Sequence, residues 1–270
     1  MDNDTDGSGG FLPQSLPSPA PSNFSASSTA SNLPHPRAHP LRAGSAKEDA
    51  ARRYVESRLL HISRRYTKKF QPPDELEDVH GYESMSEVSK DLGEVVDVLW
   101  LSGTRMYFVF LLSTLANSVS ASLQIPYLLN VALAVTTYLP AFPPSPVATF
   151  KLLRKLDHAF ASLLKGEDSE TGESLPGFEA GKRAGMSGTD MVRCKSLVES
   201  TRVMIVDVMN QDPEVEKGDP DESGAETDAM SVDESAYGIE EDEHDMDVAR
   251  VYERTIVQLG EVLGGAFDTG

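Results

Sequence analysis

The fold is decided by one stretch near the middle of the chain, Ser145-Pro-Val-Ala-Thr-Phe-Lys-Leu-Leu-Arg-Lys-Leu-Asp-His-Ala-Phe-Ala-Ser-Leu-Leu-Lys-Gly166. Ser145 followed by Pro146 is typical of a helix start, because the first turn leaves its N–H groups unpaired and proline has none to lose. Gly166 is a typical helix stop. Between them, apolar residues recur at helical spacing and form one stripe. The stripe consists of Phe150, Leu153, Leu156, Phe160 and Leu163.

Working outward, five other segments show the same period, and none alternates as a strand does over a convincing length. They are residues 45–70, 84–99, 122–139, 189–209 and 248–263. The sequence therefore predicts an all-α fold, a bundle of about five to six helices flanked by a disordered N-terminal arm and an acidic linker. We expect helix 122–139 to be the central, buried one, because its second face is also mostly apolar. The last helix is predicted to be detachable or swapped.

Capping boxes mark the starts of the first two helices, with Ser45 and Glu48 in one and Ser84 and Glu87 in the other. The first helix is rich in arginine, whereas the second carries aspartate and glutamate beside its apolar face. Antiparallel packing of the two would bring opposite charges together. Each exposed pair would contribute about 0 to 1 kcal/mol.

Composition divides the chain into four regions. Residues 1–44 are predicted to be a disordered Ser/Pro-rich arm and 45–210 a helical domain with a flexible loop at 166–188. Residues 211–247, with sixteen acidic residues and one lysine, are predicted to be an acidic disordered linker before the C-terminal helix at 248–265. Arg37 to Lys69, in contrast, has a net charge of +7. Both charged regions are candidate interaction surfaces, although many acidic tails only aid solubility.

Residues Met106–Phe150 contain no charged side chain, although the formal net charge of the protein is -19. Its most apolar part, Met106–Ala116, is about half the length needed to cross a bilayer, so we do not expect a membrane protein. An ordinary buried helix is an alternative. We favour a third interpretation, in which residues 105–121 are a retained intron of 17 codons. The acidic N-terminus and the single Cys194 predict an intracellular protein.

No set of residues predicts a reaction, so we expect a protein that is not an enzyme and has no catalytic, cofactor-binding or metal-binding residues. Gly177–Arg183 departs from a phosphate-binding loop in spacing and follows no strand. The histidines are scattered, which excludes a zinc site. His158 beside Asp157 is interpreted as part of an exposed helix face. Cys194 is expected to be a small core residue.

The best interaction candidates are basic residues on the first and fourth predicted helices. The arginines could neutralise DNA phosphates, but the apolar stripe beside them and the acidic composition favour a protein partner. Nucleic acid is therefore a secondary candidate. The predicted partner-binding residues are Arg52, Arg53, Arg58, Arg64, Arg65, Lys68, Lys151, Arg154 and Lys155.

Several runs together resemble a known family. They are Glu48-Asp-Ala-Ala-Arg-Arg-Tyr-Val-Glu-Ser-Arg-Leu-Leu-His-Ile-Ser-Arg-Arg-Tyr, Asp97-Val-Leu-Trp-Leu-Ser-Gly-Thr, Leu123-Gln-Ile-Pro-Tyr-Leu-Leu and Tyr138-Leu-Pro-Ala-Phe-Pro-Pro-Ser-Pro, which leads into the predicted helix from Phe150 to Leu164. Over residues 45–210 the chain resembles the fungal accessory (eleventh) subunit family of the general transcription factor TFIIH. It departs from the family pattern at residues 105–121, where direct continuity is expected.

The resemblance implies a non-catalytic nuclear protein without a cofactor. It would bind the XPB-type translocase and other TFIIH subunits, and would promote dissociation of the translocase from the complex in RNA polymerase II transcription. The alternative is a nucleic-acid-binding factor in recombination or repair that uses the same arginines.

Overall fold

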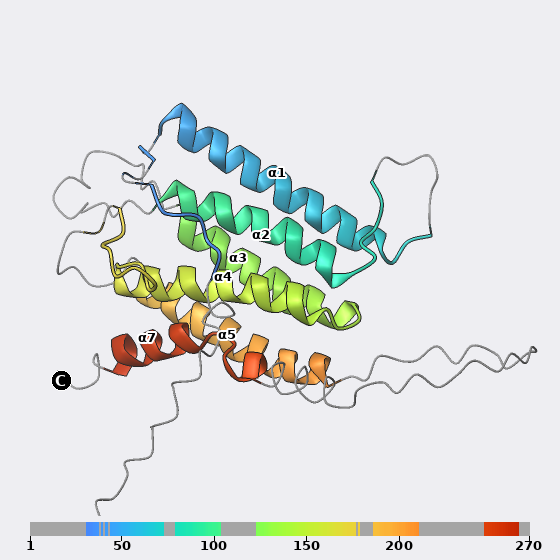
Figure 1. Cartoon of the computed structure of the whole chain (residues 1–270). Coiled ribbons are helices and arrows are strands. Elements are labelled where there is room, and N and C mark those ends of the chain that lie inside the picture. The colour runs from blue at the N-terminus through green and yellow to red at the C-terminus, as the bar shows by residue number, and fades with distance from the viewer. Residues whose placement is uncertain are drawn as a thin grey trace, which may run out of the picture. The chain divides into compact units, whose positions relative to one another are not determined.

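The computed structural model describes residues 31–37, 39, 41–42, 44–72, 79–103, 123–176, 178, 186–210 and 246–264, and most of these residues are helical (Figure 1). No named strand occurs among these residues. The all-α prediction is therefore confirmed. The helices are α1 (Ala46–Lys68), α2 (Met85–Ser102), α3 (Gln124–Tyr138), the short 3-10 helix η1 (Leu139–Ala141), α4 (Pro146–Lys165), α5 (Gly188–Met209) and α7 (Glu253–Gly264).

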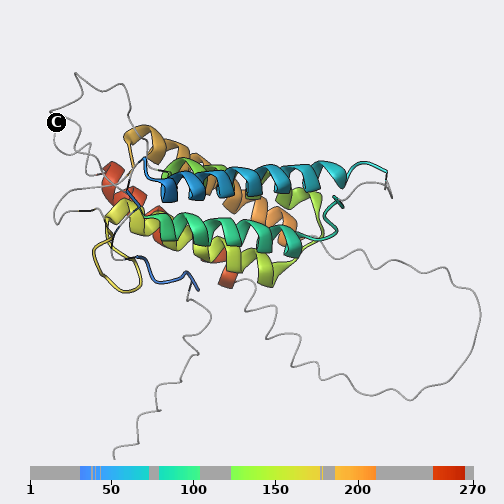
Figure 2. The ribbon, with the colours of Figure 1, turned by 90° about the horizontal axis from the view of Figure 1, so that it is seen from above.

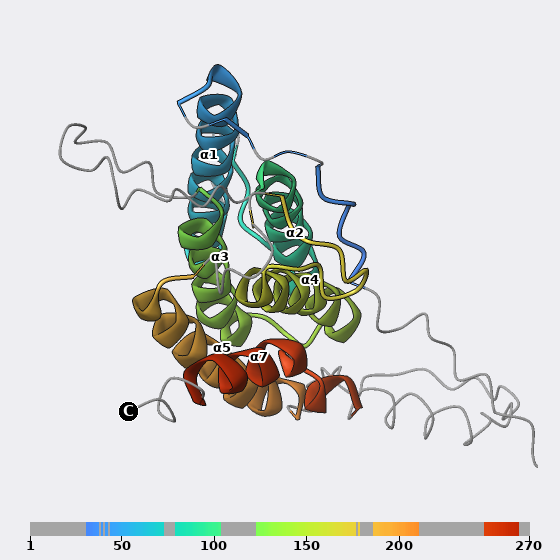
Figure 3. The same cartoon turned by 90° about the vertical axis from the view of Figure 1, so that its left-hand side faces the viewer.

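The helices lie in three successive pairs, which Figures 2 and 3 show from two sides. Helices α1 and α2 pack against each other, and α2 also contacts α3 and α4. On the other side of the bundle, α3 contacts α5 and α4 contacts α7. One continuous core runs through all three pairs.

The central helix of the bundle is α4, and not helix 122–139 as expected. All five residues of the predicted stripe are buried, and so are most other residues of α4, because α2 covers one side and α7 another. Helix α3 instead exposes Asn130, Leu133 and Thr137, which lie on one face at helical spacing. The apolar second face of α3 is thus a partly exposed surface.

The two predicted capping boxes are each half formed. The Ser45 hydroxyl accepts from the Glu48 backbone N–H at 3.3 Å, but the Glu48 carboxylate accepts from the N–H of Gly44 at 2.6 Å. The Ser84 hydroxyl accepts from the Glu87 N–H at 3.4 Å, while the Glu87 carboxylate is bound to α1. Each serine therefore caps its helix as predicted, and each glutamate has a different partner.

Helix α5 starts earlier than predicted, at a capping box formed by Ser187 and Asp190. The predicted inward residues Val198, Thr201, Ile205 and Val208 are buried. Val192 was also expected to be buried, but it is 62% exposed. The buried stripe instead begins at Met191 and continues through Cys194, at spacings of three and four residues, and Val192 lies one position off this stripe.

The predicted last helix is interrupted at Tyr252, which has a positive φ of 55° and a fully buried side chain. Its ring lies 6.3 Å from that of Phe160 on α4, measured between centroids. The turn lets Tyr252 point into the core before α7 begins at Glu253. Helix α7 packs on α4 and α5, so the predicted detachable helix is part of the bundle described.

Part of the predicted disordered arm, residues 31–37, lies against the bundle. Ser31 is buried, and the Trp100 indole N–H donates to the Pro34 carbonyl oxygen at 2.8 Å. Leu41 donates its backbone N–H to Ser102 at 3.0 Å. The observed structure thus extends N-terminally of residue 45, where we placed the start of the helical domain. Residues 1–30 lie outside the described residues.

Two other predicted segments also lie outside the described residues, the block 105–121 with its apolar Met106–Ala116 run and nearly all of the acidic linker 211–247. None of the helices that are described combines the length and apolar character of a membrane span. The side-chain amide of Gln124 donates to the Trp100 carbonyl oxygen at 3.5 Å, so the two ends of segment 104–122 lie close together.

Candidate protein-binding surfaces

Helices α1 and α2 are joined by an ion-pair cluster, as their opposite charges predicted. Arg58 donates to Asp91 at 3.0 Å and to Glu94 at 2.9 Å. One Asp91 oxygen also accepts from the Tyr82 hydroxyl at 2.7 Å, and burial, with this hydrogen bond, raises the pKa of Tyr82 well above its usual range. Because Asp91 is itself buried, this cluster fixes how the two helices pack.

Arg65 completes the cluster seven residues after Arg58. It is paired with Glu87, contacts Asp91 at 3.4 Å, and its guanidinium carbon lies 3.9 Å from the centre of the Tyr82 ring. Such a stacked guanidinium is held by ion-pair and cation–π attraction together. Arg58 and Arg65 therefore have structural partners inside the chain.

The structure divides the nine predicted partner-binding residues into two groups. Besides Arg58 and Arg65, Arg154 is paired with Asp247 at 3.4 Å, and Lys155 with Asp97 at 2.6 Å. Arg52 makes only a long i,i+4 pair of 3.7 Å with Glu48, and Lys68 has partners of its own. Arg53, Arg64 and Lys151 are exposed and form no ion pair within the described residues. The predicted basic surface is thus reduced to a few separate side chains.

Asp157 and His158 are buried, which contradicts the expectation of an exposed helix face. The Asp157 carboxylate accepts from the backbone N–H and the hydroxyl of Thr255 at 2.8 and 2.7 Å, and so ties α7 to α4. His158 Nδ1 lies 2.6 Å from the Ser31 hydroxyl, and its Nε2 lies 3.1 Å from Asp168. The two side chains face different neighbours, so they do not form an acid–base pair.

Cys194 is a buried core residue, as predicted. Burial raises the pKa of its thiol to about 12 from the ordinary value of 9.0. Its thiolate fraction at pH 8 is then about 1000-fold below that of a thiol with the ordinary pKa of 9.0.

We expect almost no reaction of Cys194 in the native chain with a chromogenic aromatic disulfide. In 6 M guanidinium chloride, in contrast, one thiol per chain should react at once. Rapid reaction of the native chain would contradict this packing.

An apolar groove lies between α5 and α7, with a volume of ≈ 1000 Å³. It is called the α5–α7 groove below. Val203 of α5 and Val257 of α7 line it and are 65% and 53% exposed, and Ile256 is 38% exposed. Charged residues, including Lys195, Glu199 and Glu253, also line it. A Cβ atom at Gly260 or Gly264 would meet no other atom within 4 Å, so the groove is open at both glycines. An apolar strip with charged residues along it is typical of a groove that binds an amphipathic helix.

The sequence predicted none of the α5–α7 groove, because only the buried stripe of α5 was considered. Val192, Val203 and Val206 also share a helical face, being eleven and three residues apart, and all three are exposed. This second apolar face of α5 is visible in the sequence, and Val203 is the one of the three valines that lines the groove.

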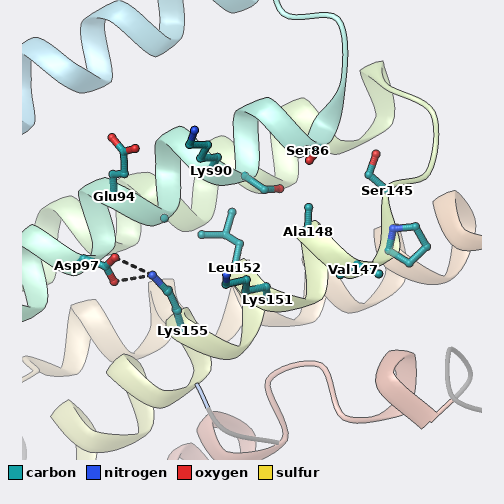
Figure 4. Close-up of a pocket in the computed structure, with 13 residues that line it drawn as sticks. Ser86, Lys90, Glu94, Asp97, Ser145, Val147, Ala148, Lys151, Leu152 and Lys155 are labelled. Carbon is teal, nitrogen blue, oxygen red and sulfur yellow. Dashed lines mark hydrogen bonds and ion pairs between the residues drawn. The ribbon is translucent and has the colours of Figure 1, made fainter. Parts of the chain in front are cut away.

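A second groove, of ≈ 580 Å³, lies between α2 and the first turns of α4 (Figure 4). It is called the α2–α4 groove below. Figure 4 shows the Asp97–Lys155 ion pair at one end, and Ser86 and Ser145 at the other. Lys151 is the one predicted site residue that lines it without an ion pair in the described structure. In the whole part of the chain that the structure describes, no group of side chains could hold a metal ion.

Comparison with known proteins places these surfaces in context. Residues 81–260 match the model of a family described as subunit 11 of the general transcription factor TFIIH. The chain belongs to this family. The TFIIH subunit 11 match spans α2 to most of α7, so it includes nearly all of both grooves, whereas the basic helix α1 lies before it.

One curated relative of the TFIIH subunit 11 family is the general transcription and DNA repair factor IIH subunit TFB6 of Saccharomyces cerevisiae. It is 26% identical over 194 residues, which is 62% of this chain and 55% of the yeast protein. The chain thus spans about half the length of this relative. No solved structure matches the chain.

Proposed function

We propose that this chain is a non-catalytic interaction subunit of TFIIH in the nucleus. In this role it binds the XPB-type translocase and promotes its dissociation from the complex during RNA polymerase II transcription. Membership of the TFIIH subunit 11 family carries the proposal. An all-helical bundle with two open grooves is consistent with a protein that acts by binding.

We assign the translocase, or the TFIIH subunit beside it, to the α5–α7 groove. Val203 and Val257 would contact the apolar face of a partner helix, and the charged residues along the groove would set its orientation. The basic helix α1 is a weaker candidate than the sequence indicated, because Arg58 and Arg65 are bound to α2. The same two ion pairs weaken the DNA-binding alternative, which needs several free cations on one surface.

Glutamate at Val203 or Val257 should reduce capture of the translocase at least about tenfold, because it places a charge in the centre of an apolar contact. Leu133→Glu is the matched control, since Leu133 is a 42% exposed apolar residue of α3 outside the groove. The first measurement is the amount of each TFIIH subunit recovered with the tagged chain from nuclear extract. The second is the amount of translocase that each variant releases from purified TFIIH.

Equal recovery with all three variants would remove the α5–α7 groove from the binding surface. Absence of every TFIIH subunit from the wild-type sample would remove the proposed function itself. Partner-independent binding of duplex DNA, with affinity falling steeply between 50 and 200 mM salt, would favour the alternative.

A further inference from the structure

The α2–α4 groove contains a buried hydroxyl that has no partner in the described structure. Ser89 lines the groove, is only 5% exposed, and its Oγ makes no hydrogen bond there. A helical serine ordinarily bonds to a carbonyl oxygen one turn earlier, and a buried polar atom without a partner is unfavourable. A ligand oxygen in the groove would provide the missing partner.

The start of α4 provides backbone donors at the same place. Pro146 has no N–H, and the Ser145 side chain makes no capping hydrogen bond. Val147 and Ala148 therefore have backbone N–H groups that no side chain caps within the described part of the chain, and both residues line the groove. Figure 4 shows them at the end opposite the Asp97–Lys155 pair. A helix N-terminus of this kind favours an anion.

Two lysines line the two sides of the groove, Lys90 from α2 and Lys151 from α4 (Figure 4). Both are exposed and form no ion pair with the residues described. Lys155, in contrast, is neutralised by Asp97 at 2.6 Å. Excess positive charge, helix N–H donors and serine hydroxyls thus line one groove, and together they match the three acceptor oxygens of a phosphate dianion.

The size and lining of the groove indicate that the phosphate belongs to a larger ligand. Its volume of ≈ 580 Å³ far exceeds a phosphate, and Val147, which is 76% exposed, adds apolar surface. Lys155, Asp97 and Glu94 are already engaged in ion pairs, so Lys90 and Lys151 are the two groove cations left for one phosphate, and the net charge of -19 disfavours nucleic acid. These features fit one phosphate beside an apolar group.

We propose that the α2–α4 groove binds a phosphorylated serine or threonine of a partner polypeptide, with an apolar residue next to it in the bound peptide. The phosphate would contact Lys90, Lys151 and the start of α4, and the apolar residue would contact Val147. This site does not depend on which TFIIH subunit occupies the α5–α7 groove.

The test uses the full chain and fluorescent peptides, each with a central phosphoserine or phosphothreonine beside Leu or Phe, and the unphosphorylated forms of the same peptides. At least one phosphopeptide should bind at least about tenfold more tightly than its unphosphorylated form. Lys90→Gln with Lys151→Gln should abolish this difference, whereas the control Lys47→Gln with Lys165→Gln, outside the groove, should keep it. Ser89→Ala should weaken phosphopeptide binding without lowering the urea midpoint of unfolding.

A second measurement does not depend on the peptide sequences chosen. Titration of the ¹⁵N-labelled chain with phenyl phosphate should shift the amide signals of Val147 and Ala148. No phosphate-dependent binding in the panel together with unmoved amides would overturn the proposal. The proposal would also be overturned if phosphoinositide vesicles or duplex DNA bound more tightly than the phosphopeptides and lost this binding in the variant with Lys90→Gln and Lys151→Gln. The ligand of the groove would then not be a peptide.

Discussion

Asp157→Ala should lower the free energy of unfolding by about 3 kcal/mol. The carboxylate is buried between α4 and α7, and it accepts from both the backbone N–H and the hydroxyl of Thr255. Alanine at position 157 removes the acceptor of the backbone N–H groups of Thr255 and Arg254, and the buried Thr255 hydroxyl keeps only its 3.1 Å contact with the backbone carbonyl oxygen of residue 157. Urea unfolding followed by circular dichroism measures the loss, and hydrogen exchange should show faster opening in α7 than in α1.

Two further variants separate the hydrogen bonds from the charge. Asp157→Asn keeps one carbonyl acceptor for Thr255, so it should destabilise less than Asp157→Ala. Asp207→Ala removes an exposed carboxylate of α5 and should change stability by less than about 0.5 kcal/mol. If Asp157→Ala unfolds at the same urea concentration as Asp207→Ala, Asp157 does not hold α7 in place.

The pH dependence of this site has a definite sign. Burial raises the pKa of Asp157 above its ordinary value of 3.8, although the Thr255 hydrogen bonds oppose the shift. The folded state therefore binds the proton more tightly than the unfolded state, and the stability contributed by this group falls as pH rises from 3.8 through the folded pKa. Subtracting the Asp157→Asn profile from the wild-type profile should isolate this fall. A difference that rises with pH over the same range would contradict it.

The second large effect is expected for Arg65→Glu, which should destabilise the chain by about 2 to 4 kcal/mol. The variant loses the pairs with Glu87 and Asp91 and the contact with the Tyr82 ring, and it adds a fourth carboxylate to a cluster that already holds Glu87, Asp91 and Glu94. Arg65 keeps 21% of its side-chain surface exposed, so solvent screening holds the effect below that of a fully buried charge.

Arg64→Glu provides a control with the same charge change one residue earlier. Arg64 is exposed and forms no ion pair with any described residue, so its reversal should alter stability by no more than about 0.5 kcal/mol. Thermal unfolding of the two variants side by side measures the difference. Similar melting temperatures would show that the cluster does not hold α1 on α2. Reversing both arginines together cannot test partner binding, because the Arg65 change disturbs the fold.

Most of the fold was predictable because helix period and helix ends are local properties of the chain. The stripe of α4, its start at Ser145 and its stop at Gly166 all follow from residues within one segment. The roles of Arg58 and Arg65 could also have been predicted, because each lies three residues after a buried residue of the α1 stripe, Val55 or Ile62.

The burial of His158 could not be predicted in this way. The residues that cover it, Ser31 and Asp168, come from separate segments, one of them over a hundred positions away. The free Ser89 hydroxyl depends similarly on how α2 meets α4. Local pattern predicts which residues form a helix, whereas burial of a polar side chain depends on distant segments that fold back on it.

The hydrogen bond from the Gln124 side chain to the Trp100 carbonyl oxygen has a consequence for the connection between α2 and α3. Since the end of α2 and the start of α3 are already adjacent, Gly103, Thr104, Ser122 and Leu123 alone would make a connection of ordinary length for packed helices. A longer connection also costs little, about 0.6 kcal/mol for each doubling of loop length. We therefore expect a chain that lacks residues 105–121 to form the same described helices and the same two grooves.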